Sequence, residues 1–301
     1  MTTAPLTKTI PLNHKAFLKV QERVDKVRAA YAESSSEYEN FLIIGDYGTG
    51  KTQLASTCPT PVFIDSFDPG GTKTAALQPG IASGDIIVEN KWEKDSWKKP
   101  FAYGQWEREM EERVQEKFFD HIGTYILDSS TTWASSLMFE TLRRGTGGRS
   151  RVGKNPELQD YLFQQLTAID CLGMMMGLPC HVLVTGHISL DKDEKSGKME
   201  TGLLMYGKLS EKVPLVFDEK YVMRTKDGST GVIYEMLTKN DGYYKAETRM
   251  GGGTPSQPGF KQLEEPNIKK LLMKAGRRFE DKPSLFPKEP SLFPKEEEGS
   301  K

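Results

Sequence analysis

Cysteine is scarce in this chain, and so are long runs of apolar residues. The 301 residues include three cysteines, Cys58, Cys171 and Cys180, which are too few and too scattered for a disulfide framework or a zinc knuckle. No apolar stretch is long enough to cross a membrane, and no signal peptide stands at the N-terminus. These absences argue against a disulfide scaffold or a membrane protein and predict a reduced, cytoplasmic compartment.

An excess of charge of one sign is also missing. Lys and Arg number 41 and Asp and Glu number 42, so the formal net charge is −1. With so little net charge, no global field attracts nucleic acid, and any such site must be a local patch. Hydrophobic residues make up 37% of the chain, an ordinary share for a protein that buries a core.

The strongest motif present is a glycine-rich loop. Four apolar residues at 41–44 predict a buried strand, and a full match to the phosphate-binding pattern G-x-x-x-x-G-K-[ST] follows. Its glycines let successive N–H groups point at one anion, and the helix expected from Lys51 adds its positive end. Lys51 is expected to reach the β- and γ-phosphates of ATP, and the Thr52 hydroxyl to ligate Mg²⁺. The candidate ATP-binding residues are Gly45, Asp46, Tyr47, Gly48, Thr49, Gly50, Lys51 and Thr52.

Two further buried strands end in carboxylates. Residues 62–65 lead into a turn-rich loop that contains Asp68, and the apolar residues 124–127 end at Asp128. In open α/β sheets, ligands bind at the carboxyl ends of the strands. Asp128 is therefore expected to hold Mg²⁺ through a water, as the second motif of phosphate-loop ATPases does.

The rest of the core predicts alternating helices and strands, then a change of period. Residues 158–176 form a long apolar-faced helix and residues 181–187 a buried strand, whereas from residue 217 the period is two. Strands are expected at 221–224, 232–237 and 243–249, with turns at Asp227-Gly228 and Asp241-Gly242. The predicted fold is α/β, a mainly parallel sheet flanked by helices and extended by an antiparallel β-meander. Trp92, Trp97 and Trp106 either stack bases or pack a helix on the sheet, and packing is favoured.

A basic, glycine-rich stretch at 143–154 joins two predicted helices. It contains five positive charges, no negative charge and four glycines. It is either a solvated surface loop or a flexible cationic loop for the phosphate backbone of DNA. The DNA-binding candidates are Arg143, Arg144, Arg149, Arg151 and Lys154.

Both ends of the chain lie outside the predicted core at 39–250. Residues 1–38 form an arm and an amphipathic helix, which packs on its own core or docks on a neighbouring subunit. Residues 251–301 are predicted to be a linker, a short helix and a disordered tail, in which the heptapeptide 283–289 is repeated at 290–296. The repeated Leu-Phe pair is either a bivalent binding motif or a spacer.

The order of these parts resembles the RecA-like ATPase core. It is most similar to the small phage-encoded, RecA-like single-strand annealing proteins of the nucleotide-binding AAA class. The resemblance covers about residues 39–250 and is carried by the phosphate loop, 184–187, 207–210 and 217–219. It implies ATP and Mg²⁺ bound between subunits of a ring or filament, and binding of single-stranded DNA. It also implies a single-strand-binding protein or clamp as the tail's partner and, for a phage protein, the host cytoplasm.

The resemblance also implies roles for further residues. It places DNA-binding loops at 143–155 and 190–207, and a polar γ-phosphate sensor at His187, although a buried, satisfied histidine explains this residue nearly as well. Lys245 and Arg249 could reach a neighbour's γ-phosphate, but an exposed strand face accounts for them equally.

The family usually carries a catalytic Glu after its second strand, and none is present here. Asp68 is the best substitute, and its shorter side chain predicts slow hydrolysis. The candidate catalytic residues are Lys51, Asp68, Asp128 and His187.

Three functions remain open at this point. The first is a weak, DNA-stimulated ATPase that binds single-stranded DNA in recombination, annealing or replication. The second is an assembly or loader ATPase that acts on a protein partner through its tail. The third is a nucleotide kinase, in which the arginines at 143–151 imitate a lid. DNA-stimulated ATP turnover separates the first from the second, and phosphate transfer to a nucleoside monophosphate establishes the third.

Overall fold

The computed structural model describes residues 14–34, 37–145, 148–192, 199–229, 231–253 and 258–286. Contacts divide the chain into two units, residues 1–37 and 38–301, and each is described by itself. The first unit contains α1 (His14–Ser34), a single helix. Its side chains Phe17, Leu18, Val20, Val24 and Val27 are 48 to 63% exposed.

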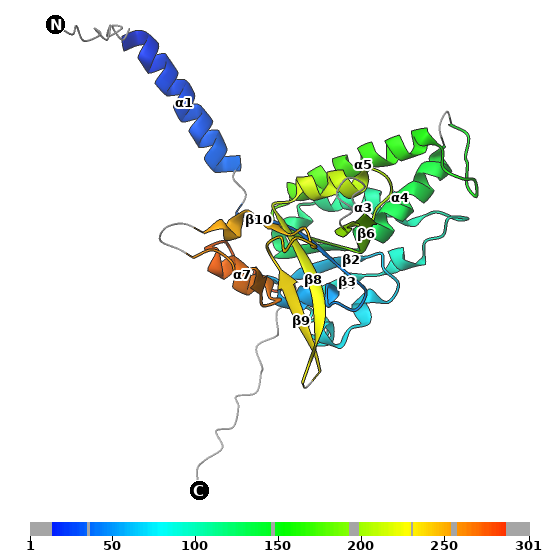
Figure 1. Ribbon diagram of the computed structural model, residues 1–301. Coiled ribbons are helices and arrows are strands. Elements are labelled where there is room, and N and C mark those ends of the chain that lie inside the picture. The colour runs from blue at the N-terminus through cyan, green and yellow to red at the C-terminus, as the bar shows by residue number, and fades with distance from the viewer. Residues whose placement is uncertain are drawn as a thin grey trace, which may run out of the picture. The chain divides into compact units, whose positions relative to one another are not determined.

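Within the described residues of the second unit, nine strands form one mainly parallel sheet (Figure 1). The order is β11-β9-β8-β1-β5-β4-β2-β3, with β10 paired to β8, and the six strands from β8 to β3 run parallel. The predicted fold class is thereby confirmed. The strands are β1 (Asn40–Gly45), β2 (Val62–Ser66), β3 (Ile86–Glu89), β4 (Thr124–Asp128), β5 (His181–Gly186), β8 (Glu219–Gly228), β9 (Gly231–Leu237), β10 (Glu247–Thr248) and β11 (Leu263–Glu264).

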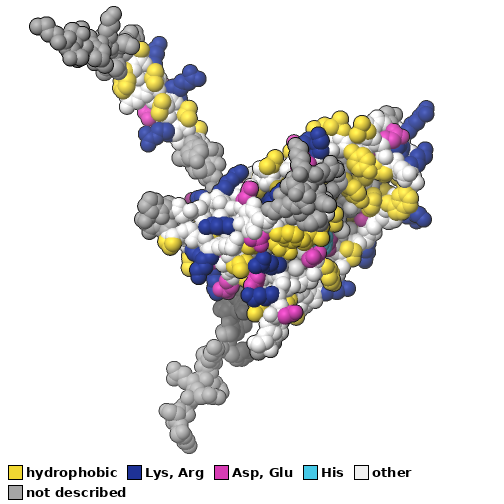
Figure 2. Space-filling model, in the orientation of Figure 1, with side chains coloured by type: hydrophobic (Ala, Val, Ile, Leu, Met, Phe, Trp, Pro, Cys, Tyr) yellow, Lys and Arg dark blue, Asp and Glu magenta, His cyan; other side chains and the backbone are white. Residues whose placement is uncertain are grey.

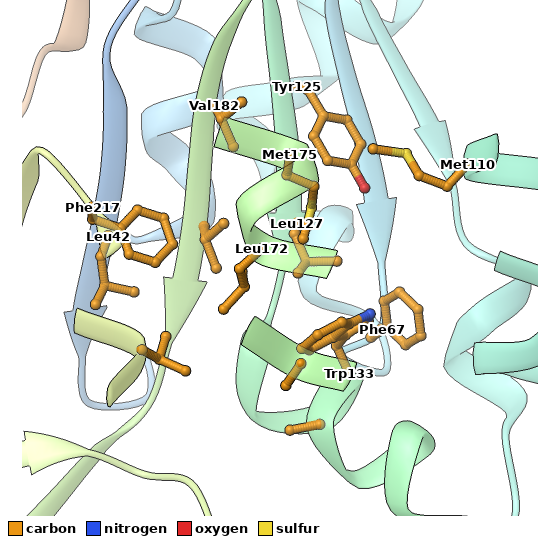
Figure 3. Close-up of a cluster of buried hydrophobic side chains, with 14 of the residues drawn as sticks. Leu42, Phe67, Met110, Tyr125, Leu127, Trp133, Leu172, Met175, Val182 and Phe217 are labelled. Carbon is orange, nitrogen blue, oxygen red and sulfur yellow. The ribbon is translucent and has the colours of Figure 1, made fainter. Parts of the chain in front are cut away.

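Helices cover both faces of this sheet, because strand residues point alternately to either side. Leu42 and Val182 contribute to one buried cluster with α3, α4 and α5, whereas Phe41 and Leu183 contribute to the other with α7. Figure 3 shows part of the first cluster, where Leu172 of α5 and Trp133 of α4 lie beside Leu127. The helices are α2 (Gln78–Ser83), α3 (Ala102–Gln115), α4 (Ser130–Arg144), α5 (Leu158–Met176), α6 (Leu209–Lys212) and α7 (Ile268–Lys274).

Packing, rather than base stacking, accounts for two of the three tryptophans. Trp92 and Trp106 are fully buried with Trp133, and Trp106 meets Trp133 edge to face with ring centroids 5.6 Å apart. The base-stacking interpretation is therefore wrong for Trp92 and Trp106. Trp97 is 45% exposed and takes no part in this cluster.

The expected helix after the phosphate loop is a 3₁₀ segment, Thr52–Thr57. The Ser56 hydroxyl donates to Gln53 O, and the Thr57 hydroxyl donates to Leu54 O. Side-chain hydroxyls of this kind compete with the backbone N–H groups that an α-helix would place on the same carbonyls. The segment is therefore a short 3₁₀ helix rather than an α-helix.

The antiparallel extension also differs from the predicted meander. Gly228 pairs with Gly231, so the β8–β9 turn falls after Asp227-Gly228 rather than on it. The strand expected at 243–249 shrinks to β10, which pairs with the first residues of β8 and not with β9. The Asp241 carboxylate accepts the N–H groups of Tyr243 and Tyr244, which removes them from any ladder.

A separate two-stranded hairpin stands where a loop was expected after His187. It consists of β6 (Ile188–Lys192) and β7 (Met199–Leu203), which pair antiparallel, and residues 193–198 between them lie outside the described residues. The hairpin begins directly after β5, so it continues from the carboxyl edge of the main sheet.

The segment after residue 250, expected as a linker and tail, contributes to the core. β11 extends the sheet beside β9, and Leu271 and Leu272 of α7 are buried with Phe260. Beyond α7 the chain crosses the amino ends of the strands, where the backbone N–H of Lys282 donates to Thr60 O and its Nζ donates to Pro179 O at 2.6 Å. The first Leu-Phe pair is described, and the second copy of the repeat lies outside the described residues.

Candidate nucleotide site

The phosphate loop begins where β1 ends, at the carboxyl edge of the sheet. A Cβ on Gly45 would lie 2.5 Å from Met223 O on the neighbouring β8, so only glycine lets these backbones approach. Gly48 and Gly50 have φ angles of 76° and 85°, a left-handed region that disfavours any side chain. The sequence therefore specifies this loop conformation locally, and the packing of β8 fixes its position.

Lys51 is buried at the centre of the loop. Its Nζ donates to Gly45 O at 2.9 Å and to Asp46 O at 2.8 Å. Burial lowers the pKa of Lys51, and the carboxylates of Asp128, Asp68 and Asp46 oppose that shift. The ammonium group is thus held over the loop by two neutral carbonyls, which the oxygens of a phosphate could replace.

Asp128 meets the end of this loop through a hydroxyl. Thr52 Oγ1 donates to Asp128 Oδ2 at 2.8 Å, and Thr185 of β5 donates to the other oxygen. Burial raises the pKa of Asp128, although the two hydroxyl hydrogen bonds oppose the shift. A Cβ on Gly71 would lie 3.3 Å from Asp128 Oδ2, so the backbone also approaches closely here. Hydroxyl and carboxylate oxygens in one place suit Mg²⁺, which prefers oxygen ligands.

Asp68 lies beside this pair with three donors of its own. It accepts hydrogen bonds from Ser129 Oγ at 2.8 Å, from Thr132 Oγ1, and across 3.0 Å from His187 Nε2. Burial alone would raise the pKa of Asp68, but the hydrogen bonds from His187, Thr132 and Ser129 outweigh it and lower the pKa. The structure therefore brings Lys51, Asp68, Asp128 and His187 together at one edge of the sheet. The His187 side chain is 27% exposed, so it is not a fully buried histidine.

Asp65 occupies a different environment from Asp68. It accepts hydrogen bonds from Trp92 Nε1 at 2.9 Å and from Trp106 Nε1 at 3.0 Å. Arg113 and Tyr125 each donate to it at 2.8 Å, and its side chain is fully buried. With all of these donors in the core, Asp65 is not available as a base for water.

Glu93 is a residue of the site that sequence reasoning missed. Its carboxylate accepts from Ser66 Oγ at 2.8 Å and from Gly70 N at 3.0 Å, so it holds both ends of the loop that carries Asp68. Glu93 follows β3, the next strand beside β2. The rule that ligands bind at carboxyl ends of strands could have identified it, had it been applied to this strand as well.

The basic residues at 143–154 divide into two groups. The acids Glu140, Glu107 and Asp160 neutralise three of the arginines, Arg143, Arg144 and Arg151. Arg149 and Lys154 are exposed and form no ion pair with any residue that the structure describes. This loop follows α4, whose 15 residues span about 22 Å at 1.5 Å per residue.

Lys245 and Arg249 do not enter the phosphate site of their own chain. Both are exposed, and Arg249 pairs with Asp218 across 2.9 Å. The Arg249 N–H donates to Glu219, the first residue of β8, at the amino edge of the sheet. Any nucleotide that Arg249 reaches must therefore belong to a neighbouring molecule.

These observations define a class of protein. The glycine loop, its lysine and threonine, and an acidic strand end at Asp128 form a nucleotide site of the P-loop type. The strand that carries the loop and the strand that carries Asp128 are separated by β5.

Comparison with known proteins gives the family. Residues 37–250, most of the chain, match the AAA domain family. The chain therefore belongs to the AAA domain family and is a RecA-like P-loop ATPase. No curated protein sequence matches it.

Two solved structures are among those similar to the chain. The flagellar accessory protein FlaH from Methanocaldococcus jannaschii is 10% identical with a TM-score of 0.36, over 75% of this chain and 83% of that one. A KaiC-like protein, PH0186, from Pyrococcus horikoshii is 14% identical with a TM-score of 0.37, over 70% and 82%. Likeness at this level does not transfer a function. Among the described helices, none is both long and apolar enough to span a bilayer.

Proposed function

We propose that this protein binds ATP and Mg²⁺, hydrolyses ATP slowly, and binds single-stranded DNA in phage recombination, annealing or replication. The observation that carries the ATPase part is the position of Asp68, ionised and oriented by three donors beside Thr52 and Asp128. A carboxylate so placed can accept a proton from an attacking water, which is general-base catalysis.

The residues of the chain divide the work. The backbone N–H groups of the loop and the Lys51 ammonium hold the phosphates, while Thr52 and Asp128 would hold Mg²⁺. When bound, Mg²⁺ offsets the negative charge that develops on the phosphates. His187 keeps Asp68 in place across 3.0 Å and is itself within reach of the same space. Glu93 fixes the loop, so Asp68 is held without a long side chain of its own.

Binding of single-stranded DNA rests on fewer residues than the sequence suggested. Arg149 and Lys154 are the two cations of the basic loop that remain exposed without an acidic partner. Each phosphate contact on a single strand contributes about 0.7 to the slope of log affinity against log salt.

The test is ATP turnover with and without single-stranded DNA, together with DNA affinity at several salt concentrations. Wild-type protein should hydrolyse ATP faster with DNA. Arg149→Ala with Lys154→Ala should flatten the salt slope by about 1.4 and remove the stimulation. Arg143→Ala with Arg144→Ala is the matched control and should change the slope less, because acids already neutralise these arginines. Equal slopes in all three proteins would overturn the assignment of this loop.

A second candidate is a loader ATPase that acts on a protein through its tail. The observation that favours it is the exposure of Leu285 and Phe286 in the first repeat, at 37% and 60%. A single-strand-binding protein or a clamp is the proposed kind of partner. The Phe286 ring lies over Gly84 of its own chain, where an added Cβ would be 2.6 Å away. Changing Phe286 and Phe293 separately to Ala, and measuring capture of a purified single-strand-binding protein, would show whether the tail binds it.

A further inference from the structure

An uncovered apolar face lies along α5. Leu158, Leu162 and Leu166 recur every four residues and are 87, 58 and 64% exposed, so they form one stripe along the helix. Phe163 widens it, and Leu215 continues it beyond the helix. Shallow hollows follow this stripe from one end to the other. Figure 2 shows hydrophobic side chains gathered over the region of α4 and α5. Exposed apolar surface of this extent marks an interaction site.

A second uncovered apolar stripe belongs to α1. Phe17, Val20, Val24 and Val27 follow helical spacing of three and four residues, and each is about half exposed or more. The phosphate site uses neither stripe. A helix of this kind gains most of its stability from burying its apolar face, so a partner for that face is needed.

The two helices are complementary in charge and in length. The α1 sequence contains five Lys and Arg residues and three acids, whereas α5 contains two Asp residues and no Lys or Arg. Pairing α5 with a second α5, or α1 with a second α1, would bring charges of one sign together. At 1.5 Å per residue, the 21 residues of α1 and the 19 of α5 span about 32 and 29 Å.

We propose that α1 of one copy docks its apolar stripe along the α5 stripe of a second copy. Each copy then offers one α1 and one α5 face, so the contact is head to tail. Such contacts close into a ring or continue as a filament, depending on the rotation between neighbours. The contact uses no residue of the phosphate site, so self-association through it requires no nucleotide.

Cysteine cross-linking between two different variants tests this contact. One preparation carries Val24→Cys and the other Leu162→Cys, and the two are mixed under mild oxidation. We expect a disulfide-linked dimer in the mixture, and much less in either variant mixed with wild type, in which Cys58 and Cys180 are buried. A link that forms only within a single chain carrying both substitutions would overturn the proposal. Efficient self-linking of Leu162→Cys would also overturn it, because α5 would then be its own partner.

Mass measurement in solution provides the second arm. Leu162→Asp with Leu166→Asp should abolish self-association at concentrations where wild type assembles. Leu204→Asp, a change at another exposed leucine away from α5, should not. Both positions on α5 are exposed, so circular dichroism should show an unchanged fold. Binding of a fluorescent ATP analogue by the same samples should be unaffected, which separates failure of this contact from failure of the nucleotide site. Assembly of the double variant like wild type would refute the docking.

Discussion

Two carboxylates three residues apart, Asp65 and Asp68, belong to two different regions of this molecule. Asp65 is enclosed by indole, phenol and guanidinium groups, which are large side chains fixed by core packing. Asp68 is held by two hydroxyls and an imidazole at the open edge of the sheet. Hydroxyl hydrogens rotate and can turn to a new partner, whereas packed rings cannot move. The first region therefore serves the fold, and the second can serve chemistry.

The largest expected effect follows from breaking the Asp65 region. Asp65→Ala should lower the free energy of unfolding by about 3–5 kcal/mol, because it leaves the nearly buried Arg113 without its counter-charge. Denaturant unfolding measures this loss. Asp68→Ala is the matched control, and we expect it to unfold close to wild type. Equal losses for the two variants would show that both carboxylates serve the fold.

The next effect concerns catalysis at Asp68. Asp68→Asn should reduce the rate of ATP hydrolysis by about 10²- to 10⁴-fold, the usual contribution of a general base. ATP affinity should stay near wild type, since Asp68 contacts neither Lys51 nor the loop backbone through a hydrogen bond. Single-turnover hydrolysis and equilibrium binding, measured on the same protein, separate the two steps. Hydrolysis at the wild-type rate would place the base elsewhere, in a neighbouring subunit.

Lys51 lies between the two extremes, buried but facing the loop. Lys51→Ala should weaken ATP binding by about 100-fold, because a charged partner of the phosphates is lost. The fold should persist, since Lys51 donates only to two carbonyls of its own loop. Isothermal titration with ATP gives the affinity, and thermal unfolding gives the control. Unchanged ATP affinity would contradict the nucleotide site as a whole.

The smallest effect distinguishes the two acids of the site by the sign of their pH dependence. Burial raises the pKa of Asp128, so the folded chain holds this proton to higher pH than the unfolded chain. Its contribution to stability is present below the ordinary value of 3.8 and is lost as pH rises through the folded pKa. Asp128→Asn should therefore melt with a flatter decline than wild type as pH rises above about 4, in the absence of nucleotide.

Asp68 should show the opposite sign. Its pKa is lowered by hydrogen bonds from His187, Thr132 and Ser129 that outweigh burial, so its contribution is present above 3.8 and lost as pH falls through the lower folded value. Melting curves of Asp68→Asn and Asp128→Asn across pH 2.5 to 7 compare the two. Slopes of the same sign in both variants would contradict the assigned environments.

Local patterns alone were sufficient for much of this protein. The phosphate loop needs particular residue types at fixed spacing, and the acid of Asp128 ends an unbroken apolar strand, so each is visible within one short segment. Parallel strands buried on both faces are continuous apolar runs, which is why the α/β class was predicted correctly. The charge excess at 143–154 was equally visible, but its neutralisation by Glu140 and Asp160 was not.

What only the tertiary structure decided are the contacts made between segments far apart in the chain. Asp65 and Asp68 look alike in sequence, and their separation into a core acid and an edge acid depends on Trp106, Tyr125 and His187, which arrive from other elements. Glu93 enters the site because β3 lies beside β2. The short β10 results from a side chain that takes backbone donors out of a ladder. Motif spacing acts along the chain, whereas burial, ion pairing and hydrogen-bond competition act through space, and for that reason the sequence by itself determined the nucleotide loop but not the environment of each acid around it.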